Sequence, residues 1–355
     1  MTVEARGPEV RGSEVRAHEV QALEVGGCVE LAVLERSGLI ESRHIGAAVV
    51  VTGSGEVLRE LGDGAASVYP RSSLKLFQAI AVMRAGVSLA GAQAVLAAAS
   101  HGGTERHVGV VRELLSRASV NEDDLGCPVD WPLDTAARAA ERASGVGMRR
   151  ITMNCSGKHA AFLLACHTNG WPLDSYLTPD HPLQQLIRAT IEEYTGERVR
   201  HVGVDGCGAP VFAMSLRTLA RGVSRVSAAL SGGDDIEAQA LGHAILDNAW
   251  AIDGEGRANT IIIQGLGVIA KLGAEGVLVV GTAEGTAVAL KVLDGSMRAI
   301  TVIGVELLVS VGALEREAAD EVIAAATEEV LGGGKPVGEL RAASAITDWS
   351  NALRP

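Results

Sequence analysis

The segment HIGAAVVVTGSGEVLREL, residues 44–61, holds two strand-like runs on either side of a short turn. His44 to Val51 is almost entirely apolar, Gly53-Ser54-Gly55 supplies the turn, and Glu56 to Leu61 resumes the strand pattern. Two such runs joined by a glycine-containing loop are typical of an antiparallel hairpin. Together with the run from Val29 to Leu34, the segment predicts that the folded part of the chain begins as an antiparallel sheet.

Strand-like segments return near the C-terminus, at about residues 260–271, 276–281 and 286–293. Between the two strand regions apolar residues recur at helical spacing, which predicts helices at about 88–99, 103–118, 157–169, 181–194 and 237–250. We expect the turn Asp205–Pro210 to open a further helix and the chain to end in helices. These patterns predict an α+β fold: a mainly antiparallel sheet built from N- and C-terminal strands, packed with helices, and a helical central region at about 88–250.

The first 27 residues follow a different pattern, because Glu-Val recurs there every five residues, beginning at Glu9-Val10. That period fits neither a helix nor a strand. We therefore expect residues 1–27 to be a flexible extension. Residues 28–355 are expected to form a single domain, which the motifs below predict to be catalytic.

The overall charge and the cysteines narrow the possible partners and compartment. A net charge of -12 without a dense basic segment argues against nucleic acid as a partner. Apolar segments are interrupted before the roughly 18 residues that a membrane span needs, and the start of the chain lacks the pattern of a signal peptide. Five cysteines in a chain of this length point to reduced thiols. We expect a cytoplasmic protein.

Lysine is scarce, which makes its positions informative. Of 31 basic residues only five are lysines, at positions 75, 158, 271, 291 and 335. A lysine can lose its proton near neutral pH when it is removed from water, whereas an arginine effectively cannot. Each retained lysine is therefore a candidate for a role that requires a neutral amine.

Ser72-Ser73-Leu74-Lys75 has the S-x-x-K pattern at the expected start of a helix, where residues i and i+3 share one face. A neutral lysine held in a dry pocket can take the proton from a serine hydroxyl and make it a nucleophile. An ordinary helix-capping serine beside a surface lysine would have the same sequence. Lys271-Leu272-Gly273, at the end of an apolar run, matches the Lys-x-Gly strand that penicillin-recognising serine enzymes place opposite S-x-x-K. A solvent-exposed strand end is the alternative.

Three further stretches carry candidate site residues. Ser100, on a loop after an apolar helix, offers a second hydroxyl for Lys271. Cys155 and Cys207 each lie in a glycine-bearing turn before an expected helix, where a thiolate is favoured. Two thiolates with Lys158 or His159 are donors suited to zinc, although two separated cysteines fall short of a four-ligand signature. Buried inert cysteines remain the simpler interpretation of these residues alone.

At these residues the chain resembles the Rhizobium etli-type (class 3, thermolabile) L-asparaginases, also called the asparaginase II family. The resemblance runs from about Val29 to Leu314 and rests on the ordered blocks Arg71-Ser72-Ser73-x-Lys75, Ala99-Ser100-His101-x-Gly103, Met153-Asn154-Cys155-Ser156-Gly157-Lys158-His159, His181-Pro182-Leu183-Gln184, Val204-Asp205-Gly206-Cys207-Gly208-x-Pro210, Lys271-x-Gly273-Ala274-Glu275-Gly276-Val277 and Lys291-Val292-x-Asp294-Gly295. It implies a fold similar to serine β-lactamases and glutaminases. It also implies a homodimer that hydrolyses L-asparagine to L-aspartate and ammonia.

The resemblance further implies the roles of individual residues. Ser72 with Lys75, and Ser100 with Lys271, are expected to form two catalytic Ser-Lys pairs in one pocket. A zinc ion is expected to be held by Cys155, Lys158 and Cys207 and to support substrate binding more than the chemistry. We expect Arg71, Asp205 and His159 to bind the substrate, with Arg71 and Asp205 facing its carboxylate and ammonium groups.

Two departures from the family pattern bear on the site. Leu76 stands where the family often has proline, and Trp250-Ala251-Ile252 replaces a more usual proline-containing stretch. The second lies near a loop expected to border the pocket, which leaves the substrate preference less defined than the reaction type. Two alternative functions remain open at this point. One is a penicillin-type or peptide-amide serine hydrolase, and the other is a non-catalytic zinc- or amino-acid-binding protein.

Overall fold

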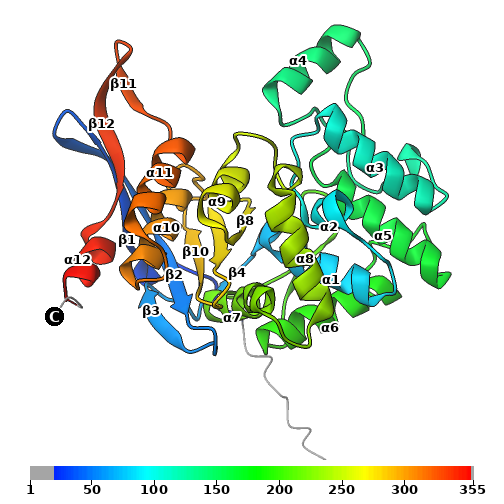
Figure 1. Ribbon diagram of the computed structural model, residues 1–355, viewed down its shortest axis with the longest axis horizontal. Coiled ribbons are helices and arrows are strands. Elements are labelled where there is room, and N and C mark those ends of the chain that lie inside the picture. Colours follow the sequence, from blue (N-terminus) through cyan, green and yellow to red (C-terminus); the bar gives the residue numbers. More distant parts are fainter. Residues whose placement is uncertain (1–19, 353–355) are drawn as a thin grey trace, which may run out of the picture.

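Strands from the two ends of the chain form one eight-stranded antiparallel sheet within residues 20–352, the part of the chain that the computed structural model describes (Figure 1). Side chains are described up to residue 348. The strand order is β11-β12-β1-β2-β10-β9-β8, and β3 pairs with β2. The bounds are β1 Val29–Arg36, β2 Leu39–Val51, β3 Val57–Leu61, β8 Ile269–Gly273, β9 Val277–Gly281, β10 Ala287–Val292, β11 Val330–Gly332 and β12 Lys335–Ala342. The predicted α+β fold, with its sheet built from both ends, is confirmed.

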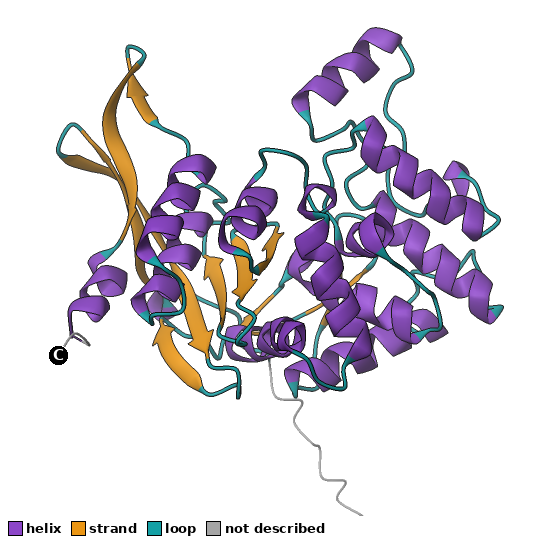
Figure 2. Ribbon diagram, in the orientation of Figure 1, coloured by secondary structure: helices purple, strands orange, loops and turns teal. Residues whose placement is uncertain are grey.

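Between β3 and β8 the chain is mainly helical, as predicted (Figure 2). The helices there are α1 Lys75–Arg84, α2 Gly91–Ala98, α3 Glu105–Arg117, α4 Thr135–Ser144, α5 Ser156–Asn169, α6 Pro182–Thr195, α7 Leu216–Ala228, α8 Ile236–Asp247 and α9 Ala258–Leu266. Four short strands pair in two small sheets: β4 Ser67–Val68 with β7 Met214–Ser215, and β5 Val202–Val204 with β6 Pro210–Phe212. No helix in residues 20–352 combines the length and the apolar character needed to cross a membrane.

Helices α7 and α10 (Ile300–Ser310) cover opposite faces of the main sheet. A Cβ atom on Gly281 would lie 2.5 Å from Ser227 Oγ of α7, whereas a Cβ atom on Gly304 of α10 would lie 2.7 Å from the Leu278 side chain. Gly281 and Leu278 are three residues apart on β9, so their side-chain directions are opposite. Coverage on both faces explains why the central strands are continuously apolar instead of alternating.

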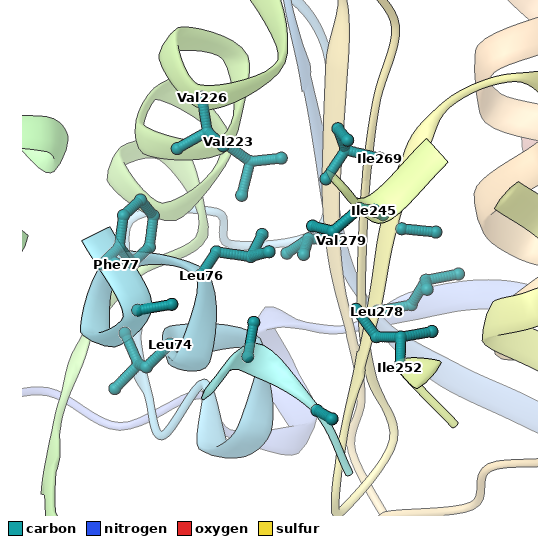
Figure 3. Close-up of a cluster of buried hydrophobic side chains, with 14 of the residues drawn as sticks. Leu74, Leu76, Phe77, Val223, Val226, Ile245, Ile252, Ile269, Leu278 and Val279 are labelled. Carbon is teal, nitrogen blue, oxygen red and sulfur yellow. The ribbon is translucent and has the colours of Figure 1, made fainter. Parts of the chain in front are cut away.

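Helix α1 is fixed by a core that it shares with α7 and the sheet. In Figure 3, Leu76 of α1 points toward Val279 of β9, whereas Phe77 lies on the other side, beneath α7, which carries Val223. All four side chains are fully buried. Because a packed core resists displacement of any member, α1 and the residues that precede it are held in a defined position against β8 and β9.

The prediction of a continuous strand over residues 260–271 is wrong in its first half. Residues 258–266 form α9, which ends at Gly267 in the left-handed conformation (φ 63°), and only Ile269–Gly273 is strand. Buried Asn259, Thr260 and Ile263 follow helical spacing. A short apolar run fits either a strand or a buried helix, and a glycine that can end a helix decides between them here.

Two other element predictions need correction. The C-terminal region does not consist of helices alone. Between α11 (Arg316–Ala326) and α12 (Ser344–Ala352) in the sequence, β11 and β12 form a hairpin, and β12 pairs with β1. Gly333 and Gly334 form the two-residue turn that joins β11 to β12, and their positive φ angles suit such a tight hairpin turn. The turn Asp205–Pro210 leads into β6 and not directly into a helix, since α7 begins only after Ser215 caps it.

The fold begins earlier than residue 28, where the predicted extension was expected to end. The Ser67 N–H donates to Gln21 O at 2.8 Å, the Leu23 N–H donates to Ser67 O at 3.3 Å, and the Asp63 N–H donates to Gly27 O at 2.6 Å. Residues 21–27 are thus attached to the fold through backbone hydrogen bonds to Asp63 and Ser67, and such bonds leave no repeating pattern in the sequence. Residues 1–19 of the predicted extension lie outside the described residues.

Truncation of a core residue of α1 tests the packing described above. Leu76→Ala is expected to lower the free energy of unfolding by about 2–5 kcal/mol, because it leaves a cavity between α1 and the sheet. The matched control is Leu39→Ala, whose side chain is 73% exposed, and it is expected to change stability by less than about 0.5 kcal/mol. Denaturant unfolding of both variants provides the measurement. Equal stability of the two variants would contradict the proposed packing.

Candidate active site

The turn that carries Ser72 is held close against β8. Arg71–Leu74 forms a 3-10 turn before α1, and Arg71 itself has φ 54°, a left-handed conformation that is uncommon for a residue with a side chain. A Cβ atom on Gly273 would lie 2.4 Å from the Pro70 carbonyl oxygen. Only glycine at that position lets the turn approach the strand this closely, which explains the Lys-x-Gly spacing in physical terms.

Lys75, the last residue of the S-x-x-K motif, is 1% exposed and points into the protein. Its Nζ lies 2.6 Å from Ala99 O, 3.0 Å from Ser100 Oγ and 3.1 Å from Cys155 Sγ. Three acceptors surround the amine on three sides, so its position is well defined. The alternative of a surface lysine beside a capping serine is therefore wrong.

Lys271 reaches the same hydroxyl from the sheet. It is fully buried, and its Nζ lies 3.1 Å from Ser100 Oγ and 2.9 Å from Leu272 O. Burial and the neighbouring positive charge of Lys75 lower the pKa of Lys271 to about 7. A substantial fraction of this amine is therefore neutral at neutral pH and able to accept a proton.

Ser100 is thus the meeting point of both lysines, which differs from the pairing predicted from the sequence. The pair Ser100–Lys271 is present, but Lys75 contacts Ser100 and not Ser72. Within the described residues the Ser72 hydroxyl has no hydrogen-bond partner, although the residue lies half-buried at the same turn. Proximity of Ser72 to Lys75 follows from their i, i+3 spacing at the start of α1, while the hydrogen-bond choice depends on side-chain rotamers.

The loop of Ser100 is anchored by the stretch that departs from the family pattern. The Ser100 N–H donates to Ile252 O at 2.9 Å, and the His101 N–H donates to Asn154 O at 3.1 Å. The His101 ring is fully buried, with Nε2 2.9 Å from Ser156 Oγ. The backbone of Trp250-Ala251-Ile252 therefore directly supports a site residue. A change of sequence there can alter the site without touching its catalytic groups.

Cys155, Lys158 and Cys207, the three predicted zinc ligands, come together beside Lys75. Lys158 is 1% exposed, and its Nζ lies 3.2 Å from Cys207 Sγ. A hydrogen bond from Cys155 lowers the pKa of Cys207 against the effect of burial, and the charge of Lys158 acts in the same direction. The same hydrogen bond, together with burial, raises the pKa of Cys155. One thiolate beside a cationic lysine is the arrangement that these contacts favour.

The donor set suits a thiophilic metal, with a lysine in place of a more usual ligand. Within residues 20–348 no group of three or more His, Cys, Asp and Glu side chains is arranged to hold a metal ion. Here two sulfurs and one amine converge, and the ring of His159, next to Lys158, interacts with Cys207. Sulfur and nitrogen donors are those that Zn²⁺ prefers. The residues present fit zinc once Lys158 and the thiols have released their protons.

His159, predicted to bind substrate, is fully buried on α5. Its Nδ1 lies 2.7 Å from the hydroxyl of Tyr176, which in turn accepts the Gly126 N–H at 2.7 Å. Burial lowers the pKa of His159 against the influence of Cys207. The ring is therefore neutral, and its polar contacts include Tyr176 and Cys207.

Arg71 and Asp205, predicted to hold the two charged groups of an amino acid, bind one another. Arg71 Nε lies 2.7 Å from Asp205 Oδ1, and their side chains are 24% and 11% exposed. The Gly206 N–H also donates to Asp205 Oδ1, at 2.9 Å. The pair presents one cation and one anion side by side at the rim of the site. That arrangement complements a ligand carrying both charges.

Sequence reasoning missed two buried polar residues that support β8. Asn259 Oδ1 accepts the Leu272 N–H at 2.7 Å, and Asn259 Nδ2 donates to Asp253 Oδ2 at 3.1 Å. Asp253 is 5% exposed and Asn259 2%. The predicted strand over 260–271 concealed them, because it left Asn259 outside any element, whereas the residue lies in the first turn of α9. Polar residues flanking an apolar run were the available signal.

A model of the L-asparaginase II family matches residues 32–342. The search of curated proteins finds no match. Among solved structures, a β-lactamase from Mycobacterium bovis is similar at 15% identity over 79% of this chain and 94% of that chain, with a TM-score of 0.38. A Bacillus glutaminase is similar at 11% identity over 70% and 83% of the two chains, with a TM-score of 0.30.

The two structural likenesses are too distant to support any inference about this chain. The family match covers nearly all of the described fold, from β1 to β12. It confirms the family predicted from the sequence and favours amide hydrolysis over the penicillin-type and non-catalytic alternatives. Because the family model covers residues 32–342 of 355, the chain belongs to the L-asparaginase II family.

Proposed function

We propose that this L-asparagine amidohydrolase attacks its substrate with Ser72 and moves the serine proton along Lys75, Ser100 and Lys271. The observation that carries the proposal is the position of Ser100 Oγ, 3.0 Å from one lysine amine and 3.1 Å from the other. Lys271, with its pKa of about 7, is the acceptor at the end of this route. A general base with a pKa near the working pH is the most effective.

In the first half-reaction the Ser72 oxygen forms a bond to the side-chain amide carbon of L-asparagine. As it does so, Ser100 gives its proton to the neutral amine of Lys271, Lys75 gives a proton to Ser100, and the Ser72 proton passes to Lys75. The carbon–nitrogen bond then breaks, and a proton returned along the same route allows ammonia to leave. In the second half, water gives up a proton along the route and its oxygen attacks the acyl carbon. The bond between that carbon and the Ser72 oxygen breaks, the proton returns to Ser72, and L-aspartate leaves.

Ser72 is favoured over Ser100 as the nucleophile because its hydroxyl is free of other hydrogen bonds within the described residues. Ser72 Oγ is half-buried and makes no hydrogen bond within the described residues, so it is free to turn toward either Lys75 or a substrate. Ser100 Oγ is held between two amines, a position suited to relaying protons. Backbone N–H groups at the start of the Ser72 turn are candidates to stabilise the negative charge on the substrate oxygen. Ser100 is the alternative nucleophile, since it already has a neutral amine within reach.

Substrate recognition is assigned to the rim of the site. The Arg71 guanidinium is proposed to bind the α-carboxylate and Asp205 the α-ammonium group, which exchanges part of their mutual ion pair for contacts with the ligand. His159 is predicted from the sequence to bind substrate. It is now proposed to act on the site indirectly, through its hydrogen bonds to Tyr176 and Cys207. Its complete burial supports this indirect role.

We also propose that Cys155, Lys158 and Cys207 hold a zinc ion. When bound, zinc would supply a fixed positive charge beside the pocket, and the hydrolytic steps above do not require it. Lys75 connects the zinc site to the hydrolytic site, because its amine contacts both Ser100 and Cys155.

We also propose an oligomeric state and a compartment for the protein. By the family resemblance it is a homodimer, and it is placed in the cytoplasm, where its five unpaired cysteines would stay reduced.

Removal of the proposed nucleophile is the first test. Ser72→Ala is expected to reduce kcat for ammonia release from L-asparagine by about a thousandfold or more, because no covalent intermediate can form. Ser88→Ala, an exposed serine outside the site, serves as the matched control. Mass mapping of acid-quenched wild-type enzyme should find the acyl group on the peptide that contains Ser72. Near-normal turnover of Ser72→Ala, with the acyl group on Ser100, would reassign the nucleophile.

The pH dependence tests the role of Lys271. As pH rises through about 7 the amine loses its proton, so kcat/KM should rise and then level off above that pH. Lys271→Arg should be nearly inactive at every pH, because a guanidinium stays charged. Lys335→Arg, at an exposed position, should keep the wild-type profile. An active Lys271→Arg enzyme with an unchanged profile would exclude Lys271 as the base.

Zinc binding can be measured without reference to activity. Cys207→Ser is expected to weaken zinc binding by more than about a hundredfold in competition with a chelating dye, because it removes a thiolate ligand. Cys28→Ser, remote from the cluster, is the control with the same chemical change. Zinc loading of the wild-type protein should also release protons into weakly buffered solution. Equal zinc affinity of all three proteins would rule out the proposed site.

A further inference from the structure

The outer edge of β8 is closed by side chains and not by another strand. Within residues 20–352, β8 pairs with β9 and with no other strand of the main sheet. On the other side the Leu272 N–H donates to Asn259 Oδ1 at 2.7 Å, and the Leu272 carbonyl accepts Lys271 Nζ at 2.9 Å. Buried backbone groups at a sheet edge need such partners. Asn259 and the proposed catalytic lysine therefore bind the N–H and the C=O of the same residue.

Asn259 is itself held in one orientation by Asp253. Its Nδ2 atom donates to Asp253 Oδ2 at 3.1 Å, and its backbone N–H lies 3.4 Å from the same oxygen. Because an amide carries its donors and its acceptor on opposite branches, the bond to Asp253 directs Oδ1 toward Leu272. The chain of contacts runs without a gap from Asp253 through Asn259 and Leu272 to Lys271.

Asp253 also brings a negative charge to this chain. Its carboxylate is 5% exposed and pairs with Arg257, whose side chain is 36% exposed and lines a cavity of about 620 Å³ beside Leu272. Besides burial, the charge of Lys75 lowers the pKa of Lys271, and the charges of Asp253 and Cys155 raise it. Asp253 is the carboxylate of this set, and it favours the protonated amine against the effects of burial and of Lys75.

We propose that Asp253 and Asn259 are positioning residues for Lys271. Asn259 fixes the free edge of β8 beside the amine, and Asp253 orients Asn259 while keeping one buried negative charge near the two lysines. The inference rests on the proposed function of Lys271 as proton acceptor. It adds that the Asp253 carboxylate, paired with the half-exposed Arg257, favours the protonated form of this amine against the larger effects of burial and Lys75.

The acid limb of the kcat/KM profile gives a readout that general structural damage would not reproduce. Asp253→Asn keeps the oxygen acceptor but removes the charge, so the limb should move to lower pH by about half a unit or more. Arg257→Gln removes the charge that offsets Asp253, so the limb should move to higher pH. Opposite shifts from the two halves of one ion pair are expected only if its charge acts on the catalytic amine.

Controls separate this inference from the function on which it rests. Asp234→Asn, an exposed carboxylate next to α8, should leave the limb in place. If the wild-type limb persists in Lys271→Arg, the proposed function fails. If the wild-type limb depends on Lys271 but neither Asp253→Asn nor Arg257→Gln moves it, the positioning inference is overturned. Should Asp253→Asn fail to fold, the variant Arg257→Gln, whose side chain is half-exposed, decides the outcome by itself.

A second pair of variants tests the positioning part. Asn259→Ala leaves the Leu272 N–H without its acceptor and should lower kcat by about tenfold or more, with KM changed less than about twofold. The exchange Asp253→Asn with Asn259→Asp keeps one carboxylate, one amide and an acceptor for Leu272, and should recover most of the lost kcat. An Asn259→Ala enzyme with normal kcat, or no recovery in a folded exchange variant, would contradict this part.

Discussion

The structure depends on one constraint, the burial of two lysine amines that share a single serine hydroxyl. Lys75 and Lys271 are each almost wholly removed from water, and both lie about 3 Å from Ser100 Oγ. Two ammonium groups in such a place would repel one another and lack solvation, so one amine is driven toward its neutral form. The chemistry proposed for this family member follows from that neutral amine, and the surrounding fold serves to keep both lysines in place.

The two lysines reach the site from different parts of the chain. Lys75 begins α1, which shares a core with α7 and the sheet, and Lys271 lies on β8, the strand at one edge of the sheet. The close contact of Gly273 with Pro70 joins these elements at the point where the Ser72 turn starts. An antiparallel sheet built from both ends of the chain makes this possible, since it brings a late strand beside the first helix.

The cysteine cluster and the hydrolytic site are continuous. Lys75 contacts both Ser100 and Cys155, and Asp205, which binds Arg71 at the rim, lies two residues before Cys207. A charge placed on the thiols is therefore felt by the amines, and the reverse also holds. Coupled groups of this kind titrate together, so a metal ion or an oxidation at the cysteines would alter the hydrolytic site as well.

The sequence by itself determined the fold class, the family and the identity of the residues that meet in the site, because periodicity and short motifs are local properties. Only the tertiary structure decided which groups touch: Lys75 bonds to Ser100 instead of Ser72, and Arg71 and Asp205 bind each other. It also decided that residues 258–266 are helical, since an apolar run suits either a strand or a buried helix until its neighbours are known. The polar residues beside the apolar run were visible in the sequence, but the support of β8 by Asn259 was not, because a side chain that closes a sheet edge is defined by contacts between separate segments.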